Sequence, residues 1–314
     1  MTKNKFKNKN VVILLAIFCM FLWGSAVPVT KISYRILNFG VEDNYTKIFF
    51  AGIRFFLASI IVFLYLHFRS DRKEYRISSL EKKDYRFLFI IGILRISLVY
   101  YFYYISIGYL SGVKASILTS SSTFFTVFIT PFIVKSDGFT KEKIIALILG
   151  FLGIIVANYN GEFDVSFTLK GEGYMLLSGL FTALSEVLIK PKGKGISAPI
   201  ITWGQLLFGS IGLLILGYFN LEKRISWTFL SIVLLIYSAM ISAVAFIIWY
   251  ELLKVNDSGE LAIYRLFIPL FGSIISSLLI PSEYLNISLF FGLIFVILGI
   301  VVLNLDNLKK KFIK

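Results

Sequence analysis

Apolar runs long enough to cross a lipid bilayer recur along the whole length of this 314-residue sequence. A helix needs about 18 or more mostly apolar residues to cross ~30 Å of bilayer hydrocarbon. Inside hydrocarbon the backbone must satisfy its own hydrogen bonds, which favours helices. Because the sequence shows no stretches of strand-like alternation, a transmembrane barrel is not expected. The sequence therefore predicts an all-α integral membrane protein.

The composition agrees with a membrane location. Apolar residues make up 57% of the chain and charged residues only 16%, and the mean hydropathy is +0.82. Soluble domains average about 25% charged residues. The formal net charge of +14 suggests either nucleic acid or an anionic lipid surface as a partner. Since the basic residues lie in short segments between apolar runs, we expect the lipid bilayer as partner and no nucleic acid.

Four lysines before the first apolar run resemble the start of a signal peptide. The run itself is too long for a typical cleaved segment, and no hydrophilic domain follows it, so we expect it to remain as the first span. We predict ten transmembrane helices, at residues 11–33, 47–68, 87–107, 114–134, 142–159, 172–190, 198–219, 228–253, 259–280 and 286–304.

The basic residues also predict the orientation of the chain. With the N-terminus inside, 22 of the 32 lysines and arginines lie in cytoplasmic segments, six lie outside and four lie within spans. Cytoplasmic loops of membrane proteins carry such an excess of lysine and arginine. We therefore expect a multi-pass protein of the cell membrane, inner or plasma, with both termini in the cytoplasm and an even number of spans.

The two halves of the chain resemble each other. A shift of 146 residues places residues 152–158 on residues 298–304, and Asp137 on Glu283. Both halves thus share an acidic loop position and a helix that ends with glycine and asparagine. Similarity between apolar helices alone would be weak support for a repeat.

Earlier spans align at a slightly different shift, which places Arg54 on Gln205.

Five spans in each half force the second half to enter the membrane in the opposite direction. We therefore expect residues 1–160 and 161–314 to form two five-helix units, a 5+5 inverted-topology repeat. Secondary transporters use such repeats to expose a site at the membrane midplane to alternate sides.

Three sequence motifs resemble the drug/metabolite transporter (DMT) superfamily, EamA branch. The W-G-S at 23–25 with Lys31 is similar to its first-span opening, and residues 53–58 are similar to its second-span R-F-x-x-A pattern. Residues 267–272, with the later run from Gly292 to Gly299, are similar to its ninth and tenth spans. The resemblance covers nearly the whole chain and implies ten helices in an inverted repeat that move small metabolites, often as exporters.

Ionisable groups within a span are costly and usually face protein or water, so each is a candidate for the site. Arg95 lies near the middle of the third span, where Phe102 and Ser106 share its helical face and Tyr103 lies slightly to one side. A guanidinium with aromatic neighbours suits a carboxylate or phosphate attached to a ring. No acidic residue is evident at its depth, so we expect Arg95 to orient an anionic or zwitterionic substrate. A structural arginine bound to carbonyls or to a glutamate is the alternative.

The fourth and ninth spans each carry a polar stripe at helical spacing, in positions related by the repeat. The stripe of the ninth span is Arg265, Pro269, Gly272 and Ser276, and that of the fourth is Thr119, Thr123, Thr126 and Thr130. Small and hydroxyl residues also serve close helix packing in lipid, so cavity lining and packing are both open. A proline in a helix either only kinks it or provides a hinge.

Glu186 lies about one turn from the cytoplasmic end of the sixth span. It can pair with Arg265 or carry a coupling proton, and a glutamate that reaches the interface is the alternative. Arg54 is expected to reach the outer interface. With Trp23 added from the resemblance, the candidate substrate-binding residues are Trp23, Arg95, Tyr103, Thr119, Thr123, Glu186, Arg265 and Pro269.

The leading functional prediction is a secondary-active or facilitative transporter, and an exporter, of a small polar metabolite such as an amino acid or a related zwitterion or anion. The sequence has no phosphate-binding glycine loop with lysine, and no cluster of metal ligands or of a nucleophile with a base. We therefore expect no enzyme activity, metal or cofactor. A membrane-embedded lipid-modifying enzyme and a non-transporting assembly subunit are the alternatives.

The predicted orientation can be tested by cysteine labelling. A cysteine in place of Lys192 should resist an impermeant thiol reagent applied to intact cells, because the basic bias places this loop in the cytoplasm. Arg224→Cys, in an expected outer loop, is the positive control. Labelling at position 192 in intact cells would contradict the orientation.

Overall fold

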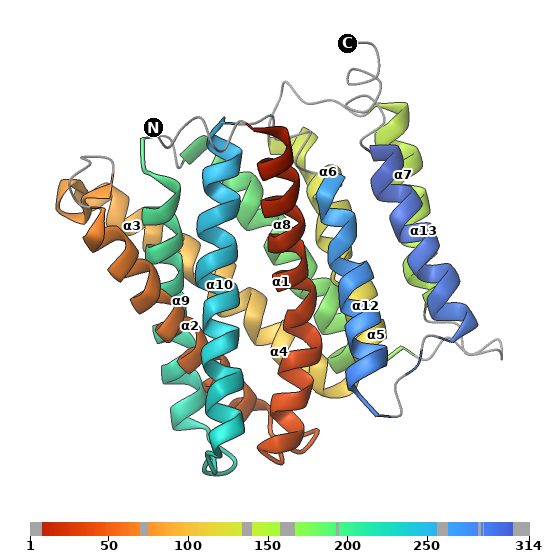
Figure 1. Cartoon of the computed structure of the whole chain (residues 1–314), viewed down its shortest axis with the longest axis horizontal. Helices are drawn as coiled ribbons and strands as arrows, with labels where there is room; N and C mark the ends of the chain where they lie inside the picture. The colour runs from red at the N-terminus through yellow and green to blue at the C-terminus, as the bar shows by residue number, and fades with distance from the viewer. Residues whose placement is uncertain are drawn as a thin grey trace.

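The computed structural model describes residues 8–69, 75–133, 140–157, 167–192, 195–255, 263–281, 284 and 286–303. Within these ranges every regular element is a helix, and the helices lie side by side in one bundle (Figure 1). We call the side on which the first helix begins the N-terminal side and the other the opposite side. The acidic loop positions of the repeat, Asp137 and Glu283, fall outside the described residues.

The first half of the chain supplies all five expected helical segments. Its first helix begins after Asn8, whose side-chain oxygen accepts a hydrogen bond from the backbone N–H of Asn10 at 3.0 Å. The elements are α1 (Lys9–Ile36), α2 (Asn44–Phe68), η3 (Ile77–Ser79), α3 (Lys82–Gly92), the π-helical turn η4 (Ile93–Leu98), α4 (Val99–Tyr109), α5 (Gly112–Leu118), α6 (Ser121–Ile133) and α7 (Lys141–Ala157).

The second half supplies the other five segments. Pro199, at the start of its second long helix, fits there because the first N–H groups of a helix have no partner within it. The elements are η5 (Leu169–Gly173), α8 (Tyr174–Lys192), α9 (Ala198–Phe219), α10 (Phe229–Val255), the 3-10 turn η6 (Ile263–Leu266), α12 (Phe267–Leu279) and α13 (Ile287–Leu303).

Seven of the described helices are long and apolar enough to span a membrane. They are residues 10–36, 44–68, 82–109, 112–129, 169–189, 198–219 and 229–249. The helices at 267–279 and 287–302 are apolar but shorter, and α7 has 17 residues. The chain is therefore a multi-pass helical membrane protein, while the count of ten spans stays a prediction.

The outward surface of the bundle is apolar. Phe132, Phe229 and Leu278 are 69%, 86% and 77% exposed, each on a different helix. Exposed apolar surface of this extent is rare on soluble monomers. In a bilayer the lipid tails cover these side chains, so the exposure agrees with a membrane location.

In two places, a helix of the first half lies antiparallel to the helix that corresponds to it in the second half. Gly52 of α2 lies against Leu214 of α9, and Phe63 lies against Trp203 with ring centroids 6.3 Å apart. Residue numbers therefore rise along α2 as they fall along α9. Helices α7 and α13 are antiparallel in the same way and lie side by side at the edge of the bundle (Figure 1).

Glycines bring α7 and α13 into direct backbone contact. A Cβ atom on Gly153 would lie 2.8 Å from the carbonyl oxygen of Gly292 and 2.9 Å from the backbone nitrogen of Val296. The repeat shift of 146 residues pairs Gly153 with Gly299, Gly292 with Ala146 and Val296 with Gly150. A Cβ atom on Gly299 would indeed lie 3.0 Å from the carbonyl oxygen of Ala146 and 3.2 Å from the nitrogen of Gly150. The contact is thus two-fold symmetric.

This contact gives a stability prediction. Gly153→Val should lower the thermal unfolding midpoint of the purified protein, because its side chain would meet the backbone of α13, which cannot move aside cheaply. Overpacking of this kind costs about 1–3 kcal/mol. Gly40→Ala is the control, since its Cβ would meet only the Asp43 carboxylate, at 3.4 Å. Equal midpoints for Gly153→Val and the wild type would contradict the close approach.

Candidate functional site

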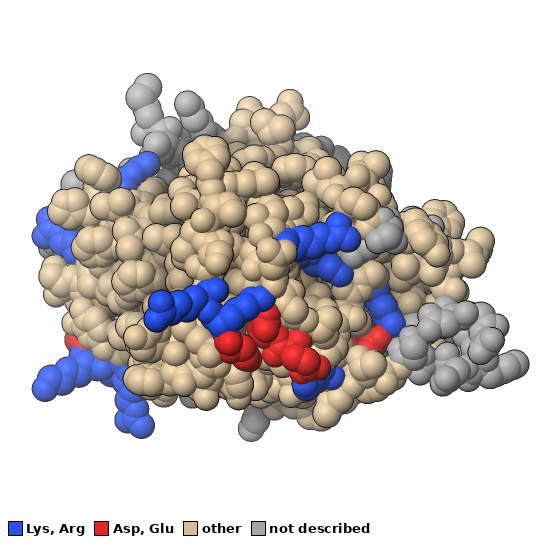
Figure 2. All heavy atoms as spheres, turned by 90° about the horizontal axis from the view of Figure 1, so that it is seen from below, with Lys and Arg blue, Asp and Glu red and all other residues tan. Residues whose placement is uncertain are grey.

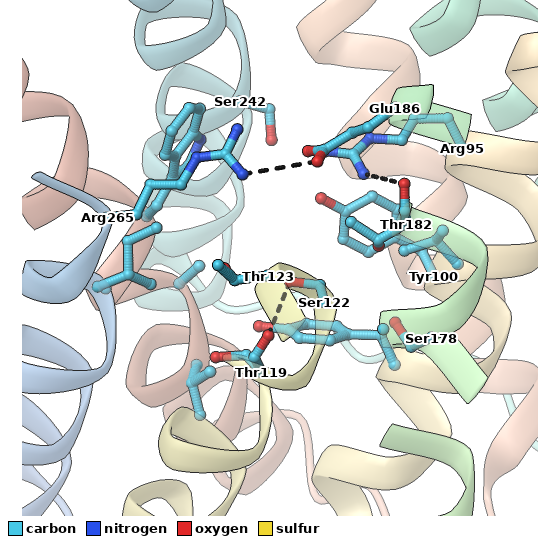
Figure 3. A pocket seen from close by; sticks show the side chains of 18 of the residues that line it. Arg95, Tyr100, Thr119, Ser122, Thr123, Ser178, Thr182, Glu186, Ser242 and Arg265 are labelled. Carbon is cyan, nitrogen blue, oxygen red and sulfur yellow. Dashed lines mark hydrogen bonds and ion pairs between the residues drawn. The ribbon is translucent and has the colours of Figure 1, made fainter. Parts of the chain in front are cut away.

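A cavity of about 690 Å³ lies inside the bundle (Figure 3). Small-molecule sites commonly have ~300–1,000 Å³. Its walls come from α1, α2, η4, α4, α5, α6, α8, α10, η6 and α12. The lining residues closest to the N-terminal side are Ile189, Trp249 and Arg265, whereas Ser116 and Met175 line the end towards the opposite side.

Glu186 of α8 binds two arginines from two other segments. Its Oε1 lies 3.3 Å from Nη2 of Arg95 in η4, and its Oε2 lies 3.5 Å from Nη1 of Arg265 in η6. Arg95 Nη1 also donates to the carbonyl oxygen of Thr182 at 3.3 Å (Figure 3). The Thr126 hydroxyl lies within 3.4 Å of Glu186 Oε2. We call Arg95, Glu186 and Arg265 the ion cluster.

The expectation that Arg95 has no acidic partner is wrong: the structure shows the alternative, an arginine bound to a glutamate and a carbonyl. Of the possibilities for Glu186, the structure shows the pairing with Arg265. In the sequence, the depth of each residue was judged from its distance to the end of its own span, which placed Glu186 closer to the interface than Arg95. Two long side chains close that difference in depth, because each can reach several ångströms along the membrane normal. The three side chains of the ion cluster are 14%, 25% and 31% exposed, so they are open to the cavity.

The π-helical turn η4 changes the face that follows Arg95. An extra residue in one turn rotates all later residues about the helix axis. Tyr103 therefore lines the cavity with Arg95, as predicted. Phe102 does not share this face, because it stacks on Phe181 with centroids 5.7 Å apart and planes 1° apart. Ser106 is buried and donates to a carbonyl of η5.

The fourth and ninth spans are irregular at positions that the repeat relates. Helix α5 ends at Leu118 and α6 begins at Ser121, while η6 ends at Leu266 and α12 begins at Phe267. The shift of 146 residues places Ser121 on Phe267. Discontinuous helices are a way for transporters to bring polar groups to the midplane. The hydroxyl residues beside the first break that line the cavity are Ser116, Thr119, Ser122, Thr123 and Thr126.

The two polar stripes have different surroundings. In the ninth span only Arg265 of the predicted stripe lines the cavity; Pro269 is buried within α12 and is not a lining residue. A Cβ atom on Gly272 would lie 2.6 Å from the Oγ atom of Ser116. Beyond Arg265 this stripe therefore serves helix packing. The side chain of Thr130, in the other stripe, is outside the described part of the chain.

Aromatic side chains form much of the remaining wall. Trp23 meets Phe246 and Trp249 edge to face, with ring centroids 5.4 and 5.7 Å away. Tyr100 and Tyr103 form a similar pair at 5.5 Å. All five rings line the cavity, which can therefore contact an apolar or aromatic part of a bound molecule.

Arg54, expected at the outer interface, is a buried lining residue of this cavity, 3% exposed. Its Nε donates to the carbonyl oxygen of Ser238 at 3.0 Å, Nη1 to the Tyr104 hydroxyl at 2.7 Å and Nη2 to the Ser242 hydroxyl at 3.1 Å. The repeat carried a signal for this burial. It pairs Arg54 with Gln205, which is also buried, so both halves keep a polar side chain inside this helix.

The loops on the opposite side are held together by charged contacts. Glu42 lies 2.8 Å from Lys170, and Asp43 lies 2.6 Å from Lys223. The carboxylate of Glu222 accepts hydrogen bonds of 2.9 and 2.8 Å from backbone N–H groups at the start of α2. Figure 2, which views the bundle from this side, shows acidic and basic side chains gathered there. The contacts join loops of the first half to loops of the second.

These contacts shift the titration of the loop carboxyl groups. Burial alone would raise the pKa of Asp43, but the hydrogen bonds from Lys223 and from the Gly40 N–H, together with the nearby lysine charges, outweigh burial and lower that pKa. The backbone N–H groups of α2 lower the pKa of Glu222 against the same effect of burial. Because both values lie below those of an unfolded chain, the contacts stabilise the fold above the ordinary carboxyl pKa of about 4 and weaken as the pH falls below it.

A second set of contacts lies between these loops and the cavity. Lys114 of α5 forms an ion pair with Glu172 of η5, and Ser106 donates to the carbonyl oxygen of Gly171 at 2.7 Å. The lining residues Ser116 and Met175 follow these groups within one helical turn along the chain. The cavity therefore stops short of the opposite side.

The cavity can bind a polar molecule through three guanidinium groups, one carboxylate and several hydroxyls, with aromatic rings against its carbon atoms. No group of three or more His, Cys, Asp or Glu side chains suited to a metal ion occurs among the described residues.

Comparison with known proteins gives a consistent family. The sequence model of the EamA-like transporter family matches residues 10–159 and again residues 169–305. An uncharacterized transporter of Bacillus subtilis (strain 168), YvbV, is 26% identical over 305 residues, which cover 95% of this chain and 93% of the relative. An uncharacterized transporter of Archaeoglobus fulgidus is 24% identical over 83% of this chain and 86% of its own.

A solved crystal structure aligns with 93% of this chain and 96% of its own, with a TM-score of 0.66. Sequence identity with it is 14%, so this likeness concerns the fold alone. The match to the family model covers most of the chain, in both halves. The chain therefore belongs to the EamA-like transporter family of the drug/metabolite transporter superfamily, as its sequence motifs predicted.

Proposed function

We propose that this chain is a secondary-active or facilitative transporter that moves a small polar metabolite through the membrane by alternating access. The observation that carries the proposal is the cavity of about 690 Å³ within the spanning helices, lined by three arginines and a glutamate. Charged groups inside a membrane are costly and are kept where they face water, a partner or a substrate. An amino acid or a related zwitterion or anion matches the polar groups and aromatic walls.

Ten spans in a 5+5 inverted repeat, over residues 1–160 and 161–314, form the framework of the proposal. Three observations support it: the antiparallel pairs α2–α9 and α7–α13, the two-fold symmetry of the Gly153 and Gly299 contacts, and the separate family matches in the two halves. Two similar units can exchange conformations, which moves the opening of a central site from one side to the other.

The arrangement of contacts suits a state open towards the N-terminal side. Two sets of ionic contacts lie beyond the cavity on the opposite side and close it there. The excess of basic residues on the N-terminal side supports a cytoplasmic location for that side in a cell membrane. A cavity that loads from the cytoplasm fits export, the direction that we propose.

The ion cluster is placed to connect substrate binding with this exchange. It joins η4, α8 and η6, and all three of its side chains border the cavity. A substrate that competes for one of its charges changes the contacts between three segments at once. Its distances are 3.3 and 3.5 Å, whereas a tight charge-assisted hydrogen bond has ~2.8 Å.

Transport can be tested by counterflow of labelled metabolites in proteoliposomes that hold the full chain. Amino acids, organic acids, nucleosides and amines loaded inside should each be tried against their own label outside. At least one should drive transient accumulation of label. A folded preparation that exchanges none of them would contradict transport and favour the assembly-subunit alternative.

The ion cluster gives a sharper prediction. Glu186→Gln should reduce exchange of the transported metabolite at least tenfold and also lower the thermal midpoint, because two arginines lose their shared carboxylate. Breaking a fully buried pair costs about 3–5 kcal/mol, and the partial exposure of this cluster reduces the cost to roughly 1–3 kcal/mol. Glu186→Gln combined with Arg265→Gln should recover part of the stability but not the exchange.

Glu81→Gln is the matched control, because Glu81 pairs with Lys83 on the exposed surface and such pairs contribute about 0–1 kcal/mol. Exchange by Glu81→Gln should equal that of the wild type. Wild-type exchange by Glu186→Gln would show that the cluster is dispensable.

A further inference from the structure

Arg54 is a buried cation with no acidic partner among the described residues. It is 3% exposed, and its three hydrogen-bond acceptors are a backbone carbonyl and two hydroxyls, all formally neutral. Its guanidinium also lies 5.1 Å from the ring centre of Phe55, which is a weak compensation. A charge buried without an anion is costly, so this position favours whatever anion can reach it.

The unused donors of Arg54 match a carboxylate. A guanidinium has five N–H donors. Nε, Nη1 and Nη2 of Arg54 each make one hydrogen bond, which leaves one N–H on Nη1 and one on Nη2. A carboxylate that binds through both oxygens needs two such N–H groups, which is the number that Arg54 has left. Since Arg54 lines the cavity, a bound molecule can reach it.

The other two arginines of the cavity differ from Arg54 in this respect. Arg95 and Arg265 share Glu186, so a carboxylate that binds either of them comes close to a resident negative charge that repels it. At Arg54 no carboxylate among the described residues opposes it. The lining therefore carries three positive charges and one negative charge: the ion cluster has a net charge of +1, and Arg54 adds a second positive charge that no acid beside it compensates.

The partners of Arg54 hold it in place for this role. Ser238 and Ser242 belong to α10, and Tyr104 belongs to α4, so one side chain of α2 is fixed by two neighbouring helices. The preorganised fork needs no reordering when a ligand arrives. Tyr100 and Tyr103 lie on the same cavity wall and can contact the carbon skeleton of a bound acid.

We propose that Arg54 is the carboxylate-binding residue of the cavity, and that the substrate is a small carboxylate-bearing molecule rather than an amine or another cation. The assignment rests on the proposed transport function and narrows its substrate class. It gives Arg54 the role that sequence depth had suggested for Arg95.

The charge of Arg54 can be measured without knowing the substrate. Cys19 is the single cysteine of the chain, so Cys19→Ser provides a cysteine-free background. Ser242→Cys then places one thiol 3.1 Å or so from Nη2 of Arg54. Its rate of reaction is compared for an anionic and a cationic methanethiosulfonate of similar size. Arg54→Gln should lower the anionic-to-cationic rate ratio at least tenfold, because a nearby unit charge acts strongly at low dielectric.

Arg86→Gln is the control for this measurement, since it removes the same charge from an exposed position outside the cavity. It should leave the ratio unchanged. If Arg54→Gln does not fold, Arg54→Lys replaces it: the ratio should persist because the charge remains. A ratio unaffected by Arg54→Gln, or faster labelling by the cationic reagent in the presence of Arg54, would overturn the proposal.

Protection of the same thiol by added ligands tests whether the site binds a carboxylate. 3-Phenylpropionate, phenylalanine and 2-phenylethylamine share a ring and a two-carbon chain, and only the first two carry a carboxylate. Both carboxylates should slow the labelling, the amine should not, and Arg54→Lys should weaken the protection about tenfold or more through loss of the planar fork. Protection by the amine alone, or by neither carboxylate, would overturn the assignment.

These outcomes are separate from those of the transport experiment. Labelling and protection occur without turnover, so an Arg54-dependent ratio in a protein that shows no counterflow would contradict the transport proposal alone. Counterflow together with a ratio independent of Arg54 would contradict the present assignment alone.

Discussion

Hydrocarbon gives a buried charge no water to bind, and the arrangement of this bundle depends on that constraint. Each arginine that faces the cavity is fixed by groups on other helices: Arg95 and Arg265 by Glu186 of α8, and Arg54 by hydroxyl and carbonyl groups of α4 and α10. Because an unpartnered charge inside the membrane is costly, these arginines are held by contacts that also join one helix to another. Helices α7 and α13, which contribute no lining residue to the cavity, associate through glycine contacts.

The two kinds of contact suit different parts of the alternating mechanism that we propose. Backbone contacts such as that at Gly153 are short and inflexible, so α7 and α13 can move together as one body. Ion pairs and hydroxyl hydrogen bonds can exchange partners at small cost, and they concentrate where η4, η6 and the gap between α5 and α6 interrupt regular helix. In this proposal the α7–α13 pair stays fixed, whereas the segments around η4, η6 and the gap between α5 and α6 can rearrange.

The sequence predicted most of the fold because apolar run length is a strong signal. Residues 198–219 were predicted as a span and form α9. The third span was predicted to begin at residue 87, but α3 begins at Lys82, because a charged first turn outside the hydrocarbon carries no hydropathy signal. The candidate site was harder. Neither the π-helical turn at Arg95 nor the burial of Arg54 follows from residue spacing, since both depend on neighbouring helices that the local sequence does not specify.

The charge of the substrate bears on the direction of transport. The interior of a cell is electrically negative, and a potential of 100 mV acts on one elementary charge with about 2.3 kcal/mol. A carboxylate without a compensating ammonium is therefore driven outward by the membrane potential, so a facilitative pathway suffices for its export. A zwitterion gains nothing from the potential and depends on its own gradient or on a coupled ion. The excess positive charge at Arg54 favours the first case, in which an uncoupled exporter is physically adequate.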